Sequence, residues 1–390
     1  MESVLYWIWL TSKTVIAPRK ITSLLEYFGS AEEIYREEAY ANIPNIGMRE
    51  ISALRDKSLA EAKKIKQKID ELGARIITFE DEDYPNALRN ITPPPYILYV
   101  RGDISGIDEI LTIAVIGTRK GYTPYGKMAT MRLSSELAKN GAIVVSGLAR
   151  GLDSAAAEGA LRAGGRTIAV TGSGLDVIYP PENKDLTEEI AKCGAIITEY
   201  PPGSQALPEH FPARNRIIAG LSNGVLVTEA RKKSGTLITA QCAMEYGRDL
   251  FAVPGNINDL NYEGANRLIQ QGAKLTANVN DILEEYPYMR REARSVDNVD
   301  NIVNEELQET AQTTPDEPGK PAEDVSDVDR YKDLNETDKR IVSLLMKKAM
   351  NIDELSRESG MTAGALNVRL TLLEMKKHVK RLPGGDYEII

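Results

Sequence analysis

The sequence predicts an α/β protein: a Rossmann-like doubly wound parallel sheet with a helical N-terminal domain and a C-terminal winged-helix domain. From residue 113 onwards, apolar runs of strand length alternate with helix-length segments. Runs of β-branched residues without polar alternation are typical of parallel strands that are covered on both faces. An acidic segment without hydrophobic periodicity then separates this region from a small C-terminal one.

Length and charge divide the chain further. A chain of 390 residues is too long for one ordinary core. Residues 292–329 carry a charge of −10 and the whole chain carries −9, so the rest is close to neutral. Such an acidic, aromatic-poor segment cannot offset its ordering entropy by burial. We expect a helical domain (SAM/helix-hairpin-helix-like) over 1–75, an extended Rossmann-like domain over 76–288, an acidic disordered linker over 289–333 and a winged-helix domain over 334–390.

The first hundred residues are predicted to be mainly helical. The segment Ile43–Ile51 resembles one helix-hairpin-helix unit, in which Gly47 would let the backbone approach a phosphate; an ordinary helical packing unit is the favoured alternative. The apolar run Val4–Leu10 is far shorter than the roughly 20 residues of a membrane span and lacks the flanks of a signal peptide. We therefore expect a cytoplasmic protein without a membrane partner. Residues 75–79 and 96–100 are predicted to be short strands that lead into the main domain.

The main domain should contain at least six strands connected by helices. Helices are predicted over 127–140, 153–163 and 182–192. The apolar runs predict strands over 113–116, 142–145, 167–170, 195–197, 225–227 and 250–253.

Glycine-rich loops follow these strands at the edge where parallel α/β sheets bind ligands. Each loop places small residues before a helix N-terminus, where free N–H groups and the helix dipole favour anions. Several such loops on one edge predict a row of phosphate sites. They are Gly117-Thr118-Arg119, Ser146–Asp153, Thr171–Asp176, Ser234-Gly235-Thr236 and Val253-Pro254-Gly255.

The spacing excludes the common nucleotide motifs. Gly172-Ser173-Gly174 is followed by Val177 where a dinucleotide fingerprint needs glycine, and no Gly-Lys-Ser or Gly-Lys-Thr occurs. The two histidines, His210 and His378, are too few for a histidine-based metal site. We expect no cofactor and no metal, and we expect the two cysteines, Cys193 and Cys242, to be buried reduced thiols.

The segment from His210 to Gly220 combines arginines with an aromatic residue. A cationic groove beside a stacking platform is how sequence-tolerant proteins bind single strands, so Phe211 is a candidate platform. The alternative places Phe211 in the core and one arginine in an internal salt bridge.

In order along about 165 residues, these motifs resemble the DNA processing protein A family (DprA, also called Smf). The resemblance rests on the loops above, on Phe211–Arg216, and on Ser234–Ala240, Phe251–Gly255 and Gly264–Ile269. It implies a non-catalytic protein that binds and protects incoming single-stranded DNA. It further implies loading of the recombinase RecA in natural transformation, and homodimers formed through the Rossmann-like domain.

The resemblance and the loops together predict the contacts with single-stranded DNA. Arg119 matches the arginine of the family's first loop, Phe211 its aromatic residue, and Lys184 a basic residue beside Asn183. The sequence departs from the family's usual pattern at two places. Family members often carry a basic residue where this chain has Ala206–Glu209, and a hairpin glycine where it has Ala17-Pro18. The predicted contacts are Gly117, Thr118, Arg119, Ser146, Gly147, Arg150, Gly172, Gly174, Asn183, Lys184, Phe211, Arg214, Asn215, Arg216, Ser234, Gly235, Thr236, Pro254 and Gly255.

The C-terminal region shows a winged-helix pattern. Helices are predicted to start near Leu334, over 352–360 and over 362–376, followed by a hairpin with a turn at 383–386. Duplex binding through the lysines and Arg381 near that hairpin is one interpretation; a protein-interaction or structural role is the favoured one.

Two other functions and one regulatory hypothesis stay open at this point. A nucleotide phosphoribohydrolase of similar fold would need a Pro-Gly-Gly-x-Gly-Thr loop, whereas the nearest segment is Lys233–Thr236, with Glu229 before it. A transcription factor would rely on the winged helix for duplex specificity. The acidic linker could fold back over the basic groove, in which case its deletion would raise DNA affinity.

Overall fold

The computed structural model describes residues 3–40, 43, 45–291, 336–346, 348, 350–359, 361, 366, 369–370, 373–374, 378–381 and 386–389. The chain divides into two compact units, Met1–Ala311 and Gln312–Ile390, and each is described by itself. The predicted acidic linker lies outside the described residues from 292 onwards. No helix in the described ranges is long and apolar enough to cross a membrane.

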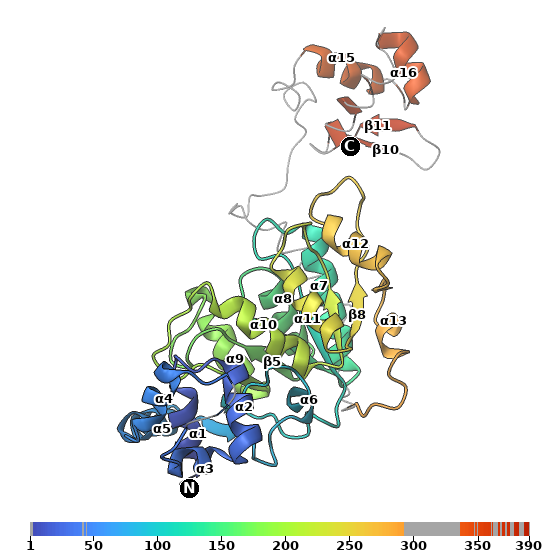
Figure 1. The fold of residues 1–390 in the computed structure, drawn as a ribbon. Helices are drawn as coiled ribbons and strands as arrows, with labels where there is room; N and C mark the ends of the chain where they lie inside the picture. Colours follow the sequence, from blue (N-terminus) through green and yellow to red (C-terminus); the bar gives the residue numbers. More distant parts are fainter. Residues whose placement is uncertain are drawn as a thin grey trace, which may run out of the picture. The chain divides into compact units, whose positions relative to one another are not determined.

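Nine strands of the described first unit form one sheet, in the order β1-β2-β6-β5-β4-β3-β7-β8-β9 (Figure 1). The strands from β3 to β9 are parallel to one another, which confirms the doubly wound sheet. Their bounds are β1 Arg75–Thr78, β2 Ile97–Gly102, β3 Thr112–Ile116, β4 Ile143–Ser146, β5 Thr167–Val170, β6 Ala195–Thr198, β7 Gly224–Val227, β8 Asp249–Ala252 and β9 Lys274–Leu275.

Two features of the sheet were not predicted. Strands β1 and β2 do not merely lead into the main domain: they extend its sheet, and β2 pairs antiparallel with β6. The short strand β9 adds a further parallel edge beside β8. Both features depend on pairings between distant segments, which local hydrophobic periodicity does not report.

Helices cover both faces of the sheet because successive residues of each central strand point to opposite sides. In β3, Ile113 and Val115 pack with α7 (Pro124–Lys139), α8 (Leu152–Arg162) and α13 (Asn280–Leu283). Ala114 and Ile116 lie in the core on the other face. That face is covered by α6 (Asn86–Arg89), α10 (His210–Leu221), α11 (Thr236–Glu245) and α12 (Glu263–Gln270), whereas α9 (Lys184–Cys193) contacts β2, β5 and β6.

The N-terminal helices share a hydrophobic core with the sheet. Trp7, Trp9 and Leu24 belong to the same buried cluster as Tyr99 of β2 and Ile196 of β6. The 1–75 helical region is therefore packed onto the sheet and does not have a separate core. Its helices are α1 Ser3–Thr11, α2 Pro18–Phe28, α3 Ala31–Arg36, α4 Met48–Arg55 and α5 Ala60–Glu71.

The helix-hairpin-helix interpretation of Ile43–Ile51 does not fit the structure. The N–H of Gly47, which would face a phosphate, donates 3.0 Å to the Glu50 carboxylate. Glu50 in turn pairs with Lys20. The Glu50 carboxylate therefore already occupies the position at the start of α4 that a phosphate would take.

The second unit contains helices α15 (Glu336–Leu345) and α16 (Ile352–Ser359) and a two-stranded hairpin of β10 (Val379–Arg381) and β11 (Tyr387–Ile389). Ile341, Leu355 and Val379 are among its fully buried residues. Most of the predicted third helix lies outside the described residues, as do Lys376 and Lys377. Lys380 pairs with Glu388 across the hairpin at 2.8 Å.

Candidate nucleic-acid interface

The glycine-rich loops meet where the sheet changes its winding direction. Strands β3 and β7 are neighbours although they are separated by three intervening strands in the sequence. Beyond the carboxyl ends of such a strand pair the flanking loops diverge, which leaves a crevice for a ligand. The loops after β3 and β7 are those that carry Arg119 and Ser234-Gly235-Thr236.

Close backbone contacts hold the β3 loop in place. The Thr118 hydroxyl donates to the carbonyl of Glu229, and the Thr118 carbonyl accepts from the N–H of Leu152 at 3.1 Å. Gly151, at φ 85°, lies so close that a Cβ atom would stand 2.5 Å from the Thr118 carbonyl. Only glycine tolerates both this conformation and this contact. The loop that carries Arg119 is thereby fixed to the start of α8.

Arg119 and Phe211 form the exposed centre of the site. Arg119 is exposed, and its guanidinium carbon lies 5.1 Å from the centre of the partly exposed Phe211 ring. Phe211 is therefore not a core residue, contrary to the alternative interpretation. A small pocket beside Arg119 is lined by Asp153, Asn215 and Thr236, and also by Gly117 and Gly235. Residues from four predicted segments therefore meet around one arginine.

Arg214 lies beneath this surface and is 1% exposed. Its guanidinium donates to the carbonyls of Gly147 and Val170, at the ends of β4 and β5. Burial lowers the pKa of Arg214 to about 10, and the neighbouring Asp153 opposes this shift. Burial likewise raises the pKa of Asp153, which Arg214 and Arg119 oppose. A Cβ atom on Gly147 would stand 2.5 Å from both side chains, so glycine makes room for this pair.

Several predicted contacts are internal supports in this conformation. Arg216 pairs with Glu199 through hydrogen bonds of 2.7 and 2.6 Å, as the salt-bridge alternative expected. The Asn183 amide donates to the Leu148 carbonyl at 3.1 Å. A direct phosphate contact does not fit residues whose polar groups are buried and already bonded. This correction applies to Ser146, Asn183, Arg214 and Arg216.

The remaining predicted residues divide between exposed and packed positions. Arg150 is exposed, pairs with Glu182 and lies 5.9 Å from the centre of the Tyr179 ring. Lys184 is exposed at the start of α9. Gly172 and Gly174 are buried, and the Gly172 carbonyl lies 2.9 Å from Nδ1 of His210.

Glu229 joins three loops and was not predicted as a site residue. This fully buried carboxylate accepts from the Thr123 N–H at 2.8 Å, from the Thr123 hydroxyl at 2.7 Å and from Tyr262 at 3.2 Å. Its second oxygen has no hydrogen-bond partner among the described residues. Gly255 lies against the Tyr262 ring and is bonded to the Asn266 side chain through both its N–H and its carbonyl. Glu229 thereby links the loops after β3, β7 and β8.

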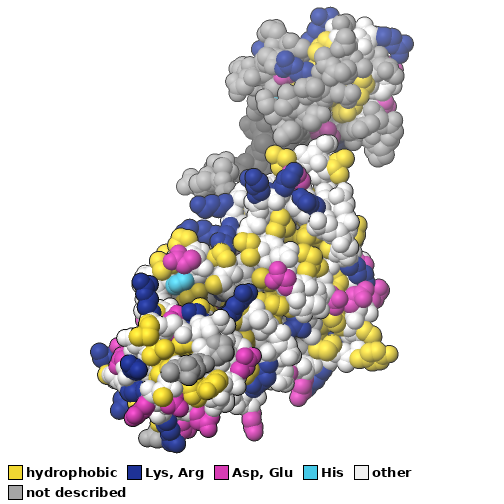
Figure 2. Space-filling model, in the orientation of Figure 1, with side chains coloured by type: hydrophobic (Ala, Val, Ile, Leu, Met, Phe, Trp, Pro, Cys, Tyr) yellow, Lys and Arg dark blue, Asp and Glu magenta, His cyan; other side chains and the backbone are white. Residues whose placement is uncertain are grey.

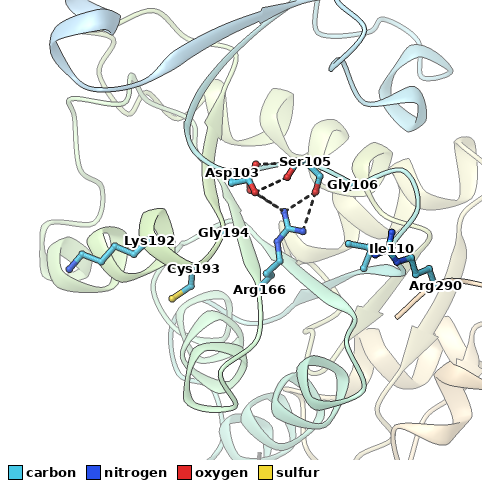
Figure 3. A pocket seen from close by; sticks show the side chains of 9 residues that line it. All are labelled: Asp103, Ser105, Gly106, Ile110, Arg166, Lys192, Cys193, Gly194 and Arg290. Carbon is cyan, nitrogen blue, oxygen red and sulfur yellow. Dashed lines mark hydrogen bonds and ion pairs between the residues drawn. The ribbon is translucent and has the colours of Figure 1, made fainter. Parts of the chain in front are cut away.

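A separate pocket lies at the opposite edge, among segments that precede β3, β5 and β6 (Figure 3). Its Arg166 donates to the carbonyls of Asp103 and Ser105, so the guanidinium braces the chain after β2. Cys193 is exposed at this pocket because it ends α9 at the rim of the sheet, and Cys242 is half-buried. The prediction of two buried thiols was therefore wrong.

The comparisons with known proteins agree with this architecture. Residues 75–287 match the family described as DNA recombination-mediator protein A, and residues 326–385 match the DprA winged helix domain. DNA processing protein DprA of Bacillus subtilis is 42% identical over 217 residues, which are 56% of this chain and 73% of that protein. Protein Smf of Synechocystis is 32% identical over 390 residues, 98% of each chain. The X-ray structure of DprA from Streptococcus pneumoniae is 37% identical with a TM-score of 0.65, covering 74% of this chain and 99% of that one. The chain belongs to the DprA/Smf family.

Proposed function

We propose that the loops at the carboxyl edge of the sheet bind single-stranded DNA without sequence preference. The exposed pair of Arg119 and Phe211 carries this proposal, because it sets a phosphate-binding cation against a stacking face. Base stacking on an aromatic ring tolerates every base, and a neighbouring cation follows the backbone. The chain's membership of a family named for DNA processing and recombination supports the same conclusion.

The surrounding residues complete the proposed surface. Exposed Lys184 and the exposed N-terminus of α11 at Gly235 offer further phosphate contacts. Arg150 would have to exchange its partner Glu182 for a phosphate. Arg214 instead supports the site from below by holding the ends of β4 and β5. The contacts proposed for DNA are therefore the residues that are at least partly exposed: Arg119, Arg150, Lys184, Phe211, Ser234, Gly235, Pro254 and Gly255. The buried residues Gly117, Thr118, Gly147, Gly172, Gly174, Asn215 and Thr236 are proposed to shape the loops that carry them.

Equilibrium binding to one mixed-sequence strand and to the same sequence as a duplex tests the proposal. The single strand should bind more tightly, because only unpaired bases expose a face to Phe211. Its affinity should fall steeply with salt, since each neutralised phosphate adds about −0.7 to the slope of log K against log salt for single strands. No single-strand affinity at low salt would refute the proposal.

We further propose that this protein protects incoming DNA in natural transformation and loads RecA onto it. The family description as a recombination mediator supports this step. The rate of RecA filament formation on a strand already covered by a single-strand binding protein should rise when the protein is added. An unchanged rate would contradict RecA loading but would leave the proposal of DNA binding unaffected.

A homodimer formed through the sheet domain is also proposed. Ile238 and Met244 of α11 and Leu275 of β9 leave apolar side chains exposed at the β7–β8–β9 end of the sheet. Sedimentation should show a dimer that Leu275→Glu converts to a monomer, whereas Met48→Glu, at an exposed residue of α4, should leave it intact. A monomeric wild type would refute this part.

We propose that the protein is not an enzyme. Glu229, the carboxylate nearest the glycine loop in the phosphoribohydrolase alternative, is fully buried and bonded to Thr123 and Tyr262. It cannot reach a substrate in this conformation. Incubation with nucleoside monophosphates should release no free base, and turnover would overturn this view.

A further inference from the structure

An exposed apolar tip lies beside the proposed DNA surface. In the loop between β8 and α12 (residues 253–262), Ile257 is 90% exposed and Leu260 is 73% exposed. Over this loop Figure 2 shows hydrophobic side chains with Lys and Arg side chains next to them. Two aliphatic side chains exposed to this extent on one loop are candidates for contact with a binding partner.

The loop's own hydrogen bonds hold the tip in shape. The Asn256 side chain accepts from the Asn258 N–H, and the Asp259 side chain accepts from the Asn261 N–H, each at 2.9 Å. Side-chain turns of this kind fix the backbone locally. The base of the loop is fixed by the contact of Gly255 with Tyr262. Ile257 and Leu260 therefore lie on a loop whose backbone conformation is held by its own hydrogen bonds.

Exposed tyrosines connect this tip to the Arg119 loop. Tyr122 and Tyr125 are both exposed and lie three and six residues after Arg119 in the chain. The Tyr125 hydroxyl donates to the Pro254 carbonyl at 3.3 Å, and its ring centre lies 5.7 Å from that of Tyr262. The β3 loop and the β8–α12 loop are thus side by side, and the tyrosines continue the surface that starts at Arg119.

Basic residues flank the same surface. Arg231 donates to the Asn261 side chain at 2.6 Å and lies against Gly121, so it stands between the two loops. Lys232 pairs with Glu263 at 3.0 Å. Lys120 is exposed, and Arg231 has no carboxylate partner among the described residues. An apolar tip beside cations that are not neutralised by carboxylates suits a nucleic acid, which offers both stacked bases and phosphates.

We propose that Tyr122, Tyr125, Ile257 and Leu260, with Lys120 and Arg231, form a second base-binding platform for the strand held at Arg119. This inference rests on the proposed function. The bases of the second stretch lie against the two tyrosines and the aliphatic tip, and its phosphates face the two cations. The positive charges of Lys120 and Arg231, and the continuity of the platform with Arg119, favour a nucleic acid over a protein partner.

The platform predicts a dependence on strand length. A strand of about four nucleotides, the small end of known site sizes, fills only the Arg119–Phe211 site, whereas one of about twelve also reaches the platform. The double variant Ile257→Ala/Leu260→Ala and the double variant Tyr122→Ala/Tyr125→Ala should each bind the long strand about tenfold more weakly. Both should bind the short strand like the wild type.

Controls and contrary outcomes separate this inference from the proposed function. Met48→Ala and Tyr27→Ala remove exposed side chains from α4 and α2 and should change neither affinity. Circular dichroism melts show whether each variant is folded. A wild type that binds neither strand refutes the proposed function itself. Unchanged long-strand affinity in both double variants overturns the platform, as does an equal loss for both strand lengths. Loss of the dimer with unchanged DNA affinity would assign the tip to a protein contact and also overturn it.

Discussion

Replacing Arg214 with methionine tests whether this arginine supports the binding loops from inside the domain. The guanidinium is buried and donates to the carbonyls of Gly147 and Val170, next to Asp153. Methionine fills a similar volume and suits helix α10, but it leaves two carbonyls without their donor and the buried Asp153 carboxylate without its neighbouring positive charge. Removing one partner of a buried charge pair costs about 3–5 kcal/mol. We expect a loss of that size in the free energy of unfolding.

Urea unfolding followed by tryptophan fluorescence and circular dichroism measures this loss. Trp7 and Trp9 lie in the core shared by the N-terminal helices and the sheet, so their emission reports on the same unit. Arg119→Ala removes an exposed arginine and should change stability by less than about 0.5 kcal/mol. Without Arg214 the pKa of Asp153 rises further, so the loss should shrink as the pH falls below neutral and the carboxyl binds a proton. Stability equal to wild type in Arg214→Met would refute the supporting role.

Three further predictions follow from buried or strained positions. Gly151→Ala should lower both the stability and the DNA affinity because the new Cβ atom would meet the Thr118 carbonyl. The control Gly247→Ala, which is also at positive φ but in open space, should cost only about 1 kcal/mol of stability. Equal effects of the two substitutions on DNA affinity would contradict this prediction. Glu229→Ala should destabilise by about 1–3 kcal/mol by leaving buried donors unpaired, and Glu229→Gln, which keeps an acceptor oxygen, should lose less in the same urea assay. Burial lowers the pKa of Lys57 to about 8, so wild type should gain stability relative to Lys57→Met as the pH rises from about 8 towards the ordinary lysine value; a constant difference between the two unfolding free energies would argue against it.

The sequence predicts the parallel strands and the loops that follow them, because burial on both faces imposes a continuous apolar run on each strand. The run from Ile113 to Ile116 is an example, with alternate residues in two different cores. The glycine loops are equally visible, since the close approach at Gly151 excludes any side chain. Local patterns of this kind need no knowledge of distant residues.

Burial of polar side chains could not be predicted in the same way. Arg214 and Arg216 look like Arg119 in the sequence, yet one donates to strand-end carbonyls and the other pairs with Glu199. Whether each arginine is buried depends on contacts with strands and loops that lie far away in the sequence. The role of Glu229 could not be predicted either, because its partners Thr123 and Tyr262 lie far from it in the chain. A carboxylate two residues after a buried strand was the sole available hint.

The affinity of Arg119→Ala for a single strand tests the central claim most directly. Fluorescence anisotropy with a labelled strand of about twelve nucleotides should be recorded over a salt series, beside Arg36→Ala as a control. Arg36 is an exposed arginine of α3 that pairs with Glu32, so both variants lose the same charge. Arg119→Ala should bind about tenfold more weakly, and the magnitude of its slope of log K against log salt should be smaller by about 0.7, while Arg36→Ala should match the wild type. Equal affinity and slope for Arg119→Ala and the wild type would contradict the account.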